Sequence, residues 1–200
     1  MTISHKRQQV PIVSLVERRT KGRKMSLAAY MNWKPEDGHK YEWNDGVLEK
    51  SEYMMTQWEF SILRNLRREL LKQDPTLRNG DFYAEGKMPT SPTRVRIPDI
   101  AYYSNEQVSL AATGKSIVAA WVIEIASEHD TIKGKEQKLL EYFQAGVQVV
   151  WYILPTSRRV EVFTSPDNSV RHSGVSRCSA APALSDFSIT VDELFASTFP

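Results

Sequence analysis

Two apolar stretches of the sequence each carry a single carboxylate, and this pattern restricts the fold more than any other feature. The first is RVRIPDIAYYS (94–104), with Asp99 directly after a proline, and the second is AAWVIEIAS (119–127), with Glu124. Side chains alternate across a strand, so each acid shares one face of its strand with apolar neighbours. An ionised carboxylate on such a face is costly to bury unless it is paired or holds a metal ion.

If the two strands are neighbours in one sheet, their carboxylates converge at one edge. Two adjacent carboxylates resist joint ionisation, and a divalent cation removes that conflict. Two carboxylates plus water molecules are a ligand set that Mg²⁺ prefers. Pro98 fits this placement, because proline in a sheet marks an edge, a strand start or a bulge. The alternative is that each acid pairs separately with an Arg or Lys. We favour a shared cation held by Asp99 and Glu124.

The segment after the second strand supplies a candidate third group. Residues 131–145, TIKGKEQKLLEYFQA, are predicted to form a helix that ends at Gly146. Lys138 and Tyr142 are four residues apart and therefore share one face of it. A lysine near a metal-bound water can orient that water and stabilise the charge that develops on a phosphate. The alternative for Lys138 is a surface lysine that contacts a neighbour such as Glu141.

Periodicity and turn residues predict the other elements. Asn44-Asp45-Gly46 between KYEW and VLEK is typical of a tight hairpin. TQWEFSILRNLRRELLKQ (56–73) has apolar residues at helical spacing, including Trp58. Further predicted elements are a helix at 26–34 capped by Ser26, strands at 82–88, 147–155 and 158–165, a final strand or turn from 184, a short helix from Thr190, a cap at Asp130 or Thr131, and loops at 105–116 and 165–182 with a short strand around Val175. This order indicates one α/β domain with a mixed central sheet flanked by α-helices.

The bulk composition is that of a globular protein, with 41% hydrophobic and 25% charged residues in 200 residues. One cysteine allows no internal disulfide, and no apolar stretch reaches the roughly 20 residues of a membrane helix. We therefore expect a cytoplasmic protein with no membrane partner. Residues 1–24 contain seven basic residues and one acid. We interpret them as a poorly ordered basic tail, and residues 25–200 as the single domain.

The order and spacing of these motifs resemble the Uma-two family of putative restriction endonucleases, in the PD-(D/E)XK nuclease superfamily. The segments that carry the resemblance are YEWNDGVLEK, IPDIAYYS, WVIEIAS, KLLEYFQAGVQVVWYILP, RRVEVF and ALSDFSITVDELF. The resemblance spans roughly residues 26–196 and leaves the basic tail outside. It implies a restriction-endonuclease-like core and metal-dependent hydrolysis of phosphodiester bonds in DNA.

The resemblance also implies which residues form the site. Asp99 matches the aspartate of the superfamily motif and Glu124 matches its (D/E) position, so both would be catalytic residues and Mg²⁺ ligands, with Mn²⁺ as an alternative cation. The backbone carbonyl of Ile125 would be a further metal ligand. Glu42 matches an upstream glutamate of the family, which implies a catalytic role as an extra metal or water ligand.

The sequence departs from the superfamily pattern at Ala126. The pattern places lysine at that position, two residues after the acid and on the same strand face. In this family the role of that lysine is expected to lie on the following helix, which again indicates Lys138 as a catalytic residue. Tyr142 is a secondary candidate on the same helix face.

Three functions are consistent with these residues. The first is a Mg²⁺-dependent DNA endonuclease, expected as a homodimer because cutting both strands needs two sites or one site used twice. The second is a catalytically inactive nucleic-acid-binding or interaction module on the same fold. Ala126 favours it, as does the net negative charge of residues 25–200, since duplex-binding surfaces are usually basic. The third, a glycosidase-like carboxylate pair, needs acids facing each other across a sugar cleft. We favour the first.

Overall fold

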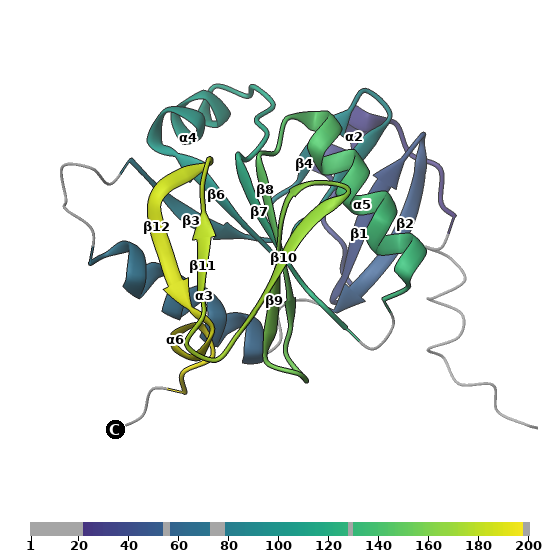
Figure 1. Cartoon of the computed structure of the whole chain (residues 1–200). Coiled ribbons are helices and arrows are strands. Elements are labelled where there is room, and N and C mark those ends of the chain that lie inside the picture. The colour runs from purple at the N-terminus through teal and green to yellow at the C-terminus, as the bar shows by residue number, and fades with distance from the viewer. Residues whose placement is uncertain (1–21, 54–56, 73–78, 128–129, 198–200) are drawn as a thin grey trace, which may run out of the picture.

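The computed structural model describes residues 22–53, 57–72, 79–127 and 130–197, which form three sheets with helices packed against them (Figure 1). In chain order the elements are α2 (Leu27–Asn32), β1 (His39–Asn44), β2 (Val47–Tyr53), α3 (Gln57–Leu70), β3 (Gly80–Ala84), β4 (Met88–Ser91), β5 (Arg94–Arg96), β6 (Ile100–Ser104), α4 (Asn105–Ala112), β7 (Trp121–Ile125), α5 (Ile132–Ala145), β8 (Val149–Leu154), β9 (Arg159–Ser165), β10 (Asn168–Ser173), β11 (Arg177–Ala180), β12 (Leu184–Thr190) and α6 (Val191–Leu194).

The central sheet has six strands in the order β10-β9-β8-β7-β6-β3. Strands β7 and β8 run parallel and are connected through α5, whereas the other neighbouring pairs in this sheet are antiparallel. The predicted mixed sheet is therefore confirmed. Because β7 and β8 are parallel, their carboxyl ends lie at the same edge of the sheet.

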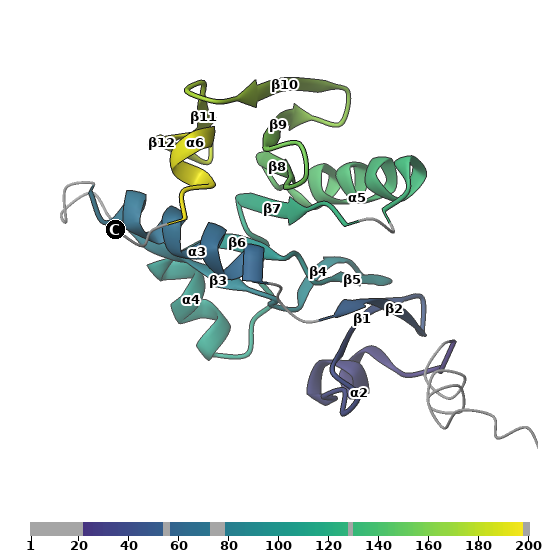
Figure 2. The ribbon, with the colours of Figure 1, turned by 90° about the horizontal axis from the view of Figure 1, so that it is seen from below.

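Each face of the central sheet has its own core (Figure 2). On one face, α3, α6 and the β11–β12 pair cover a cluster that contains Trp121, Trp151 and Phe187. The ring centre of Trp121 lies 4.6 Å from the ring centre of Trp151 and 5.0 Å from that of Phe187. On the other face, Leu139 and Tyr142 of α5 pack on the sheet. The two cores hold the sheet rigidly between layers, with α5 fixed over β7 and β8.

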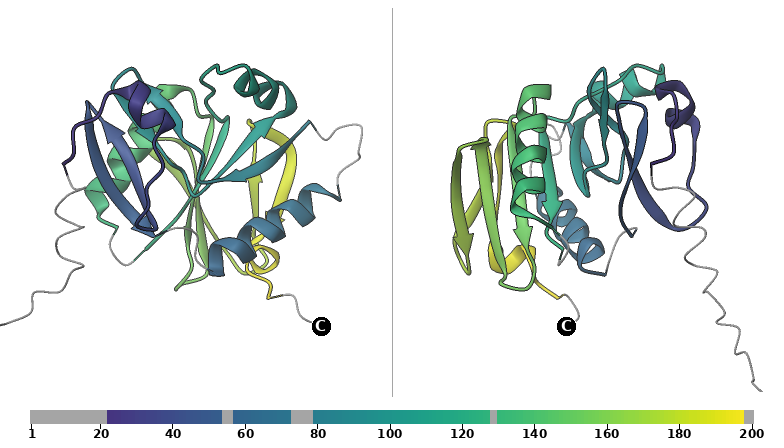
Figure 3. Two further views of the ribbon diagram at one scale, coloured as in Figure 1. Left: turned by 180° about the vertical axis from the view of Figure 1, so that it is seen from behind. Right: turned by 90° about the vertical axis from the view of Figure 1, so that its right-hand side faces the viewer.

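A second sheet, in the order β2-β1-β5-β4, lies beside the central one and is covered by α2 (Figure 3). Tyr30 of α2 is fully buried there against Tyr41, Trp43 and Val95. Its hydroxyl donates a hydrogen bond of 2.6 Å to the backbone carbonyl of Tyr41. This small core keeps the β1–β2 hairpin in place next to the central sheet.

Several local predictions are confirmed. Ser26 caps α2, and the hairpin turns through Asp45 and Gly46, both with positive φ. Thr131 rather than Asp130 caps α5, and Gly146 ends it in the left-handed conformation with φ 101°. The helix predicted from Thr190 is α6, with Thr190 as its cap. His129 lies outside the described residues, as does most of the basic tail.

The expectation that RVRIPDIAYYS forms one strand is wrong. It forms β5 and β6, which belong to different sheets and are separated by Ile97, Pro98 and Asp99. Proline has no amide hydrogen to donate to a ladder, so the strand ends before it. The predicted strand at 82–88 is similarly divided at Glu85, which has a φ of 53°. The chain thus passes from one sheet to the other at Asp99.

The two predicted loops are also wrong in part. Residues 105–112 form α4, which begins with a capping box between Ser104 and Gln107. Residues 168–173 and 177–180 form β10 and β11, and Val175 lies between these strands. β10 is an edge strand with mostly exposed side chains, so it lacks the apolar alternation that predicts a strand. Among the described residues, no helix combines the length and apolar character needed to cross a membrane.

We expect Gly80→Ala to destabilise the fold by about 1–3 kcal/mol, because the added methyl group overpacks the β3–β6 ladder. Its Cβ would lie 2.3 Å from the backbone oxygen of Tyr103 and 2.7 Å from the ring of Tyr102. Gly86→Ala is the matched control, since nothing lies within 4 Å of its added Cβ. Urea unfolding should show a change within about 0.5 kcal/mol for Gly86→Ala. Equal losses for the two variants would contradict this account of the β3–β6 contact.

Candidate active site

The two acids singled out in the sequence lie on neighbouring segments of the central sheet, Asp99 directly before β6 and Glu124 in β7. β6 and β7 are antiparallel neighbours with Ile100 opposite Ile123, and extending this register by one residue places Asp99 opposite Glu124. Both acids are buried, with exposed fractions of 7% and 4%. An oxygen of Asp99, Oδ2, accepts a hydrogen bond of 2.7 Å from the amide of Ile125. The expectation that the two strands are neighbours is confirmed.

Helix α5 brings two further groups to Glu124. The ammonium of Lys138 donates to Oε2 of Glu124 at 2.7 Å, and the hydroxyl of Tyr142 donates to Oε1. The spacing of four residues puts both groups on the buried face of α5, which packs over β7 and β8. Lys138 is therefore part of this cluster and not a surface lysine.

A second ammonium, that of Lys40 on β1, was not predicted. It donates to Oδ1 of Asp99 and is itself mostly buried. The pairing of β1 with β2 is irregular between His39 and Tyr41, on either side of this residue. The sequence held one usable signal, because Lys40 lies two residues before Glu42 in the same strand.

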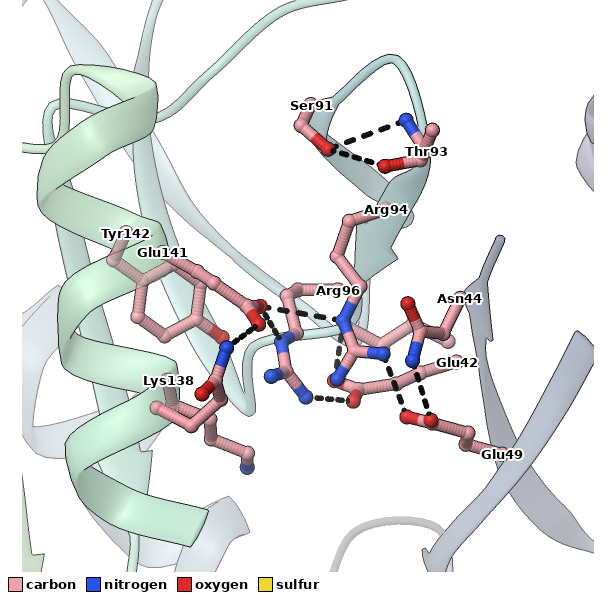
Figure 4. A network of polar contacts seen from close by, with 12 residues as sticks. Glu42, Asn44, Glu49, Ser91, Thr93, Arg94, Arg96, Lys138, Glu141 and Tyr142 are labelled. Carbon is pink, nitrogen blue, oxygen red and sulfur yellow. Dashed lines mark hydrogen bonds and ion pairs between the residues drawn. The ribbon is translucent and has the colours of Figure 1, made fainter. Parts of the chain in front are cut away.

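Glu42 lies next to this pair but is bound to groups of its own. Its Oε2 accepts from Nη1 of Arg96 at 2.5 Å, and its Oε1 accepts from the amide of Ile97 at 3.1 Å. Arg96 is buried and its Nε also donates to Glu141 on α5, at 2.6 Å (Figure 4). Arg96 therefore links the β1–β2 hairpin to the helix that carries Lys138. It too was missed in the sequence.

The network continues away from the acids. Arg94 donates to the same oxygen of Glu141 at 3.2 Å and to Glu49 of β2 at 2.7 Å (Figure 4). Asn44 donates to the other oxygen of Glu49, at 2.7 Å. Bonds between buried charged groups hold their geometry far better than exposed ones. These contacts fix the hairpin, β5 and α5 relative to one another.

The electrostatics of the cluster keep Lys138 charged. Burial alone would lower the pKa of Lys138, but the carboxylates of Glu124, Glu42 and Asp99 outweigh burial and raise it well above its usual value. Lys40 follows the same pattern, since the carboxylates of Asp99 and Glu124 raise its pKa against the effect of burial. With these acids ionised, both side chains are therefore cations at neutral pH.

The surroundings of Glu124 disfavour its negative charge. Burial raises its pKa, the opposing charges of Lys138 and Lys40 lower it, and the negative charge of Asp99 raises it again, with a net rise. Burial raises the pKa of Glu42, but Arg96, Lys138 and the amide of Ile97 together outweigh burial and lower it. The acid opposite Asp99 is thus the one that gains most from a nearby cation.

The ion pairs of Asp99, Glu124 and Glu42 determine how these acids could bind a metal ion. Each of the three acids has a basic partner, as the alternative of separate pairing anticipated. Within the described ranges no three His, Cys, Asp or Glu side chains are grouped as a metal site. The donor set nevertheless fits Mg²⁺, which takes one or two carboxylates and completes its shell with water and substrate oxygens. The amide of Ile125 is bound to Asp99, and its carbonyl as a metal ligand stays a prediction.

Known proteins share the family and the fold of this chain. The family model Uma2, described as "Putative restriction endonuclease", matches residues 27–192. The chain belongs to the Uma2 family. The fold of this chain is also similar to the crystal structure of a putative nuclease belonging to DUF820 from Anabaena variabilis ATCC 29413, with a TM-score of 0.67 over 86% of this chain and 97% of that chain. The two are 16% identical, so this likeness shows a shared fold. No curated protein matches the chain.

We expect Arg96→Met to destabilise this Uma2 protein by about 3–5 kcal/mol, because the variant leaves Glu42 buried without its ionic partner. The double variant Glu42→Gln/Arg96→Met should lose less stability than Arg96→Met alone, since it removes the unpaired buried charge. Urea unfolding of the two single variants and the double variant measures the coupling. If the two single losses simply add in the double variant, Arg96 and Glu42 are not coupled.

Proposed function

We propose that this Uma2 protein is a Mg²⁺-dependent DNA endonuclease that hydrolyses phosphodiester bonds. The observation that carries the proposal is the placement of Asp99 opposite Glu124, with the ammonium of Lys138 bound to Glu124. Membership of a nuclease family supports a nucleic acid as substrate. A homodimer stays a prediction.

The residues divide the chemistry between them. Asp99 and Glu124 would hold the cation, which when bound polarises a phosphate oxygen and lowers the pKa of a bound water. Lys138 remains protonated, so its role is to orient the attacking water and to stabilise the charge that develops on the phosphate. The water displaces one phosphodiester oxygen in line, and no covalent intermediate with the protein is needed.

Two further groups would assist. Lys40 adds a second positive charge at the same pair of acids, which suits a phosphate diester as the ligand. Arg96 and the amide of Ile97 bind both oxygens of Glu42, so Glu42 would act on an ordered water from a fixed position. Both assignments follow from contacts within the cluster and from the charge of the substrate.

We expect purified protein to nick supercoiled plasmid in Mg²⁺ or Mn²⁺, and Asp99→Asn to reduce the nicking rate by about 100-fold or more. Asp186→Asn is the matched control, because Asp186 is an exposed acid of β12 far along the chain from the site. It should nick at the wild-type rate. If wild type and Asp99→Asn nick the plasmid at the same rate, Asp99 is not a catalytic metal ligand.

The second candidate function is an inactive nucleic-acid-binding module, and it is favoured because each of the three acids has a basic partner. Measurements on wild type and Asp99→Asn distinguish the two functions. Calorimetric titration with Mn²⁺ should show a site in the wild type that Asp99→Asn weakens. Duplex binding with neither a cation site nor nicking would support the binding module instead.

We expect Lys138→Gln to slow nicking by about 100-fold or more while the Mn²⁺ site is retained, because the amide cannot supply a positive charge to the phosphate. Lys133→Gln is the control, since Lys133 lies on the same helix and is exposed. Single-turnover nicking rates compared with Mn²⁺ affinities distinguish the two effects. Normal nicking by Lys138→Gln would mean that the ammonium only stabilises Glu124.

A further inference from the structure

A cleft of about 830 Å³ opens at the carboxyl ends of the parallel strands β7 and β8. Its walls come from residues 125–127 after β7, residues 154–158 at the β8–β9 turn, and residues 58 and 59 of α3. The volume is in the range of clefts that bind small ligands. In open α/β sheets, ligands bind outside the carboxyl ends of the strands. This cleft has that position.

The cleft shares a residue with the active-site cluster. Ile125 forms part of its wall, follows Glu124 directly, and donates its amide hydrogen to Asp99. The side chain of Ile125 packs toward α3, whereas that of Glu124 points to α5 on the other face of the sheet. The cleft therefore lies at the edge of the sheet, one residue along β7 from Glu124, and a strand bound in it would pass over that edge to reach the acids.

Trp58 is the most unusual side chain of the cleft. The sequence pattern predicted it on the buried face of α3, but it is 52% exposed, whereas Trp43, Trp121 and Trp151 are buried. Its ring packs edge-on against Phe195, with ring centres 6.4 Å apart. An exposed indole beside a cleft gains free energy when an apolar surface covers it.

A cation completes this wall. The guanidinium of Arg158 lies 5.0 Å from the centre of the Phe195 ring, on the β8–β9 turn, and Arg158 has a φ of 48°. Positive φ is uncommon for a residue other than glycine. Its nearest acid, Asp192, is 3.9 Å away and exposed, so a phosphate can compete for the guanidinium. The wall thus combines an aromatic ring, a cation and the hydroxyl side chains of Thr156 and Ser157.

This combination is typical of surfaces that bind single-stranded nucleic acid, where bases stack on aromatic rings and cations follow the phosphates. A paired base in a duplex offers only its edges, since both of its faces are stacked on neighbouring pairs. A base must leave the stack before it can lie on a ring inside a recess. The chemistry of the cleft therefore suits an unpaired nucleotide.

We propose that the cleft binds one nucleobase of an unpaired nucleotide, stacked on Trp58, with a neighbouring phosphate at Arg158 and the scissile phosphate at the acids. This inference rests on the proposed nuclease function and names its substrate class: single-stranded DNA, or DNA with an unpaired segment at the cleavage point.

The test is a binding measurement without catalysis. Fluorescence anisotropy with a labelled single-stranded 12-mer in EDTA should show Trp58→Ala binding about 5- to 150-fold more weakly than wild type, the loss expected for one stacked base. Trp58→Phe should recover most of the affinity, because phenylalanine also stacks. Phe60→Ala is the matched control, since Phe60 lies on the same helix, is 59% exposed and is not part of the cleft wall. It should bind like wild type.

Three results would overturn the inference: Trp58→Ala binding as tightly as wild type, Phe60→Ala losing as much affinity as Trp58→Ala, or wild type binding a blunt duplex at least as tightly as the single strand. Thermal unfolding of both alanine variants verifies that each is folded. If binding depends on Trp58 but wild type does not nick plasmid in Mg²⁺ or Mn²⁺, the proposal that the cleft binds a base is supported and the proposed nuclease function is overturned. If wild type nicks plasmid but its binding does not depend on Trp58, the nuclease function is supported and the proposed base-binding cleft is overturned.

Discussion

Three carboxylates are buried close together in this protein, and the burial of their charges is the constraint on which the rest of the structure depends. A buried carboxylate is tolerated only with a partner, and Asp99, Glu124 and Glu42 each have a basic one. The partners come from three different elements, β1, α5 and β5. The hairpin, the crossover helix and the strand that leads to Asp99 must therefore all be in place before all three acids are neutralised.

The position of Pro98 explains how the two sheets share these charges. The proline ends β5 and lets the chain cross into the central sheet as β6. Arg96, on one side of the crossing, binds Glu42 of the small sheet, and Asp99, on the other side, lies opposite Glu124 of the central sheet. One short segment therefore joins both sheets to one cluster of charges, and the residues that carry the proposed chemistry also connect the two layers.

The sequence revealed what depends on neighbours along the chain. An acid in an apolar strand, two residues four apart in a helix, and Asp-Gly between two strands are local patterns, and they predicted Asp99, Glu124, Lys138, Tyr142 and the hairpin turn. Lys40 was missed because its partner Asp99 lies 59 residues away, and Arg96 was missed because its partners lie 54 and 45 residues away. Trp58 fits a helical apolar face, but no residue of the sheet covers it. Contacts between different sheets produce no periodic pattern of apolar residues in the sequence, so they cannot be predicted from it.

The same charges that stabilise the fold limit what the site can do. Lys40 and Lys138 neutralise the acids, which keeps Asp99 and Glu124 from repelling one another, and their raised pKa values keep both ammonium groups protonated. In the proposed reaction the two ammonium groups would act as positive charges. A phosphodiester carries the negative charge that such groups attract, and an unpaired strand entering along the Trp58 wall reaches them from the side where Ile125 holds Asp99 in place.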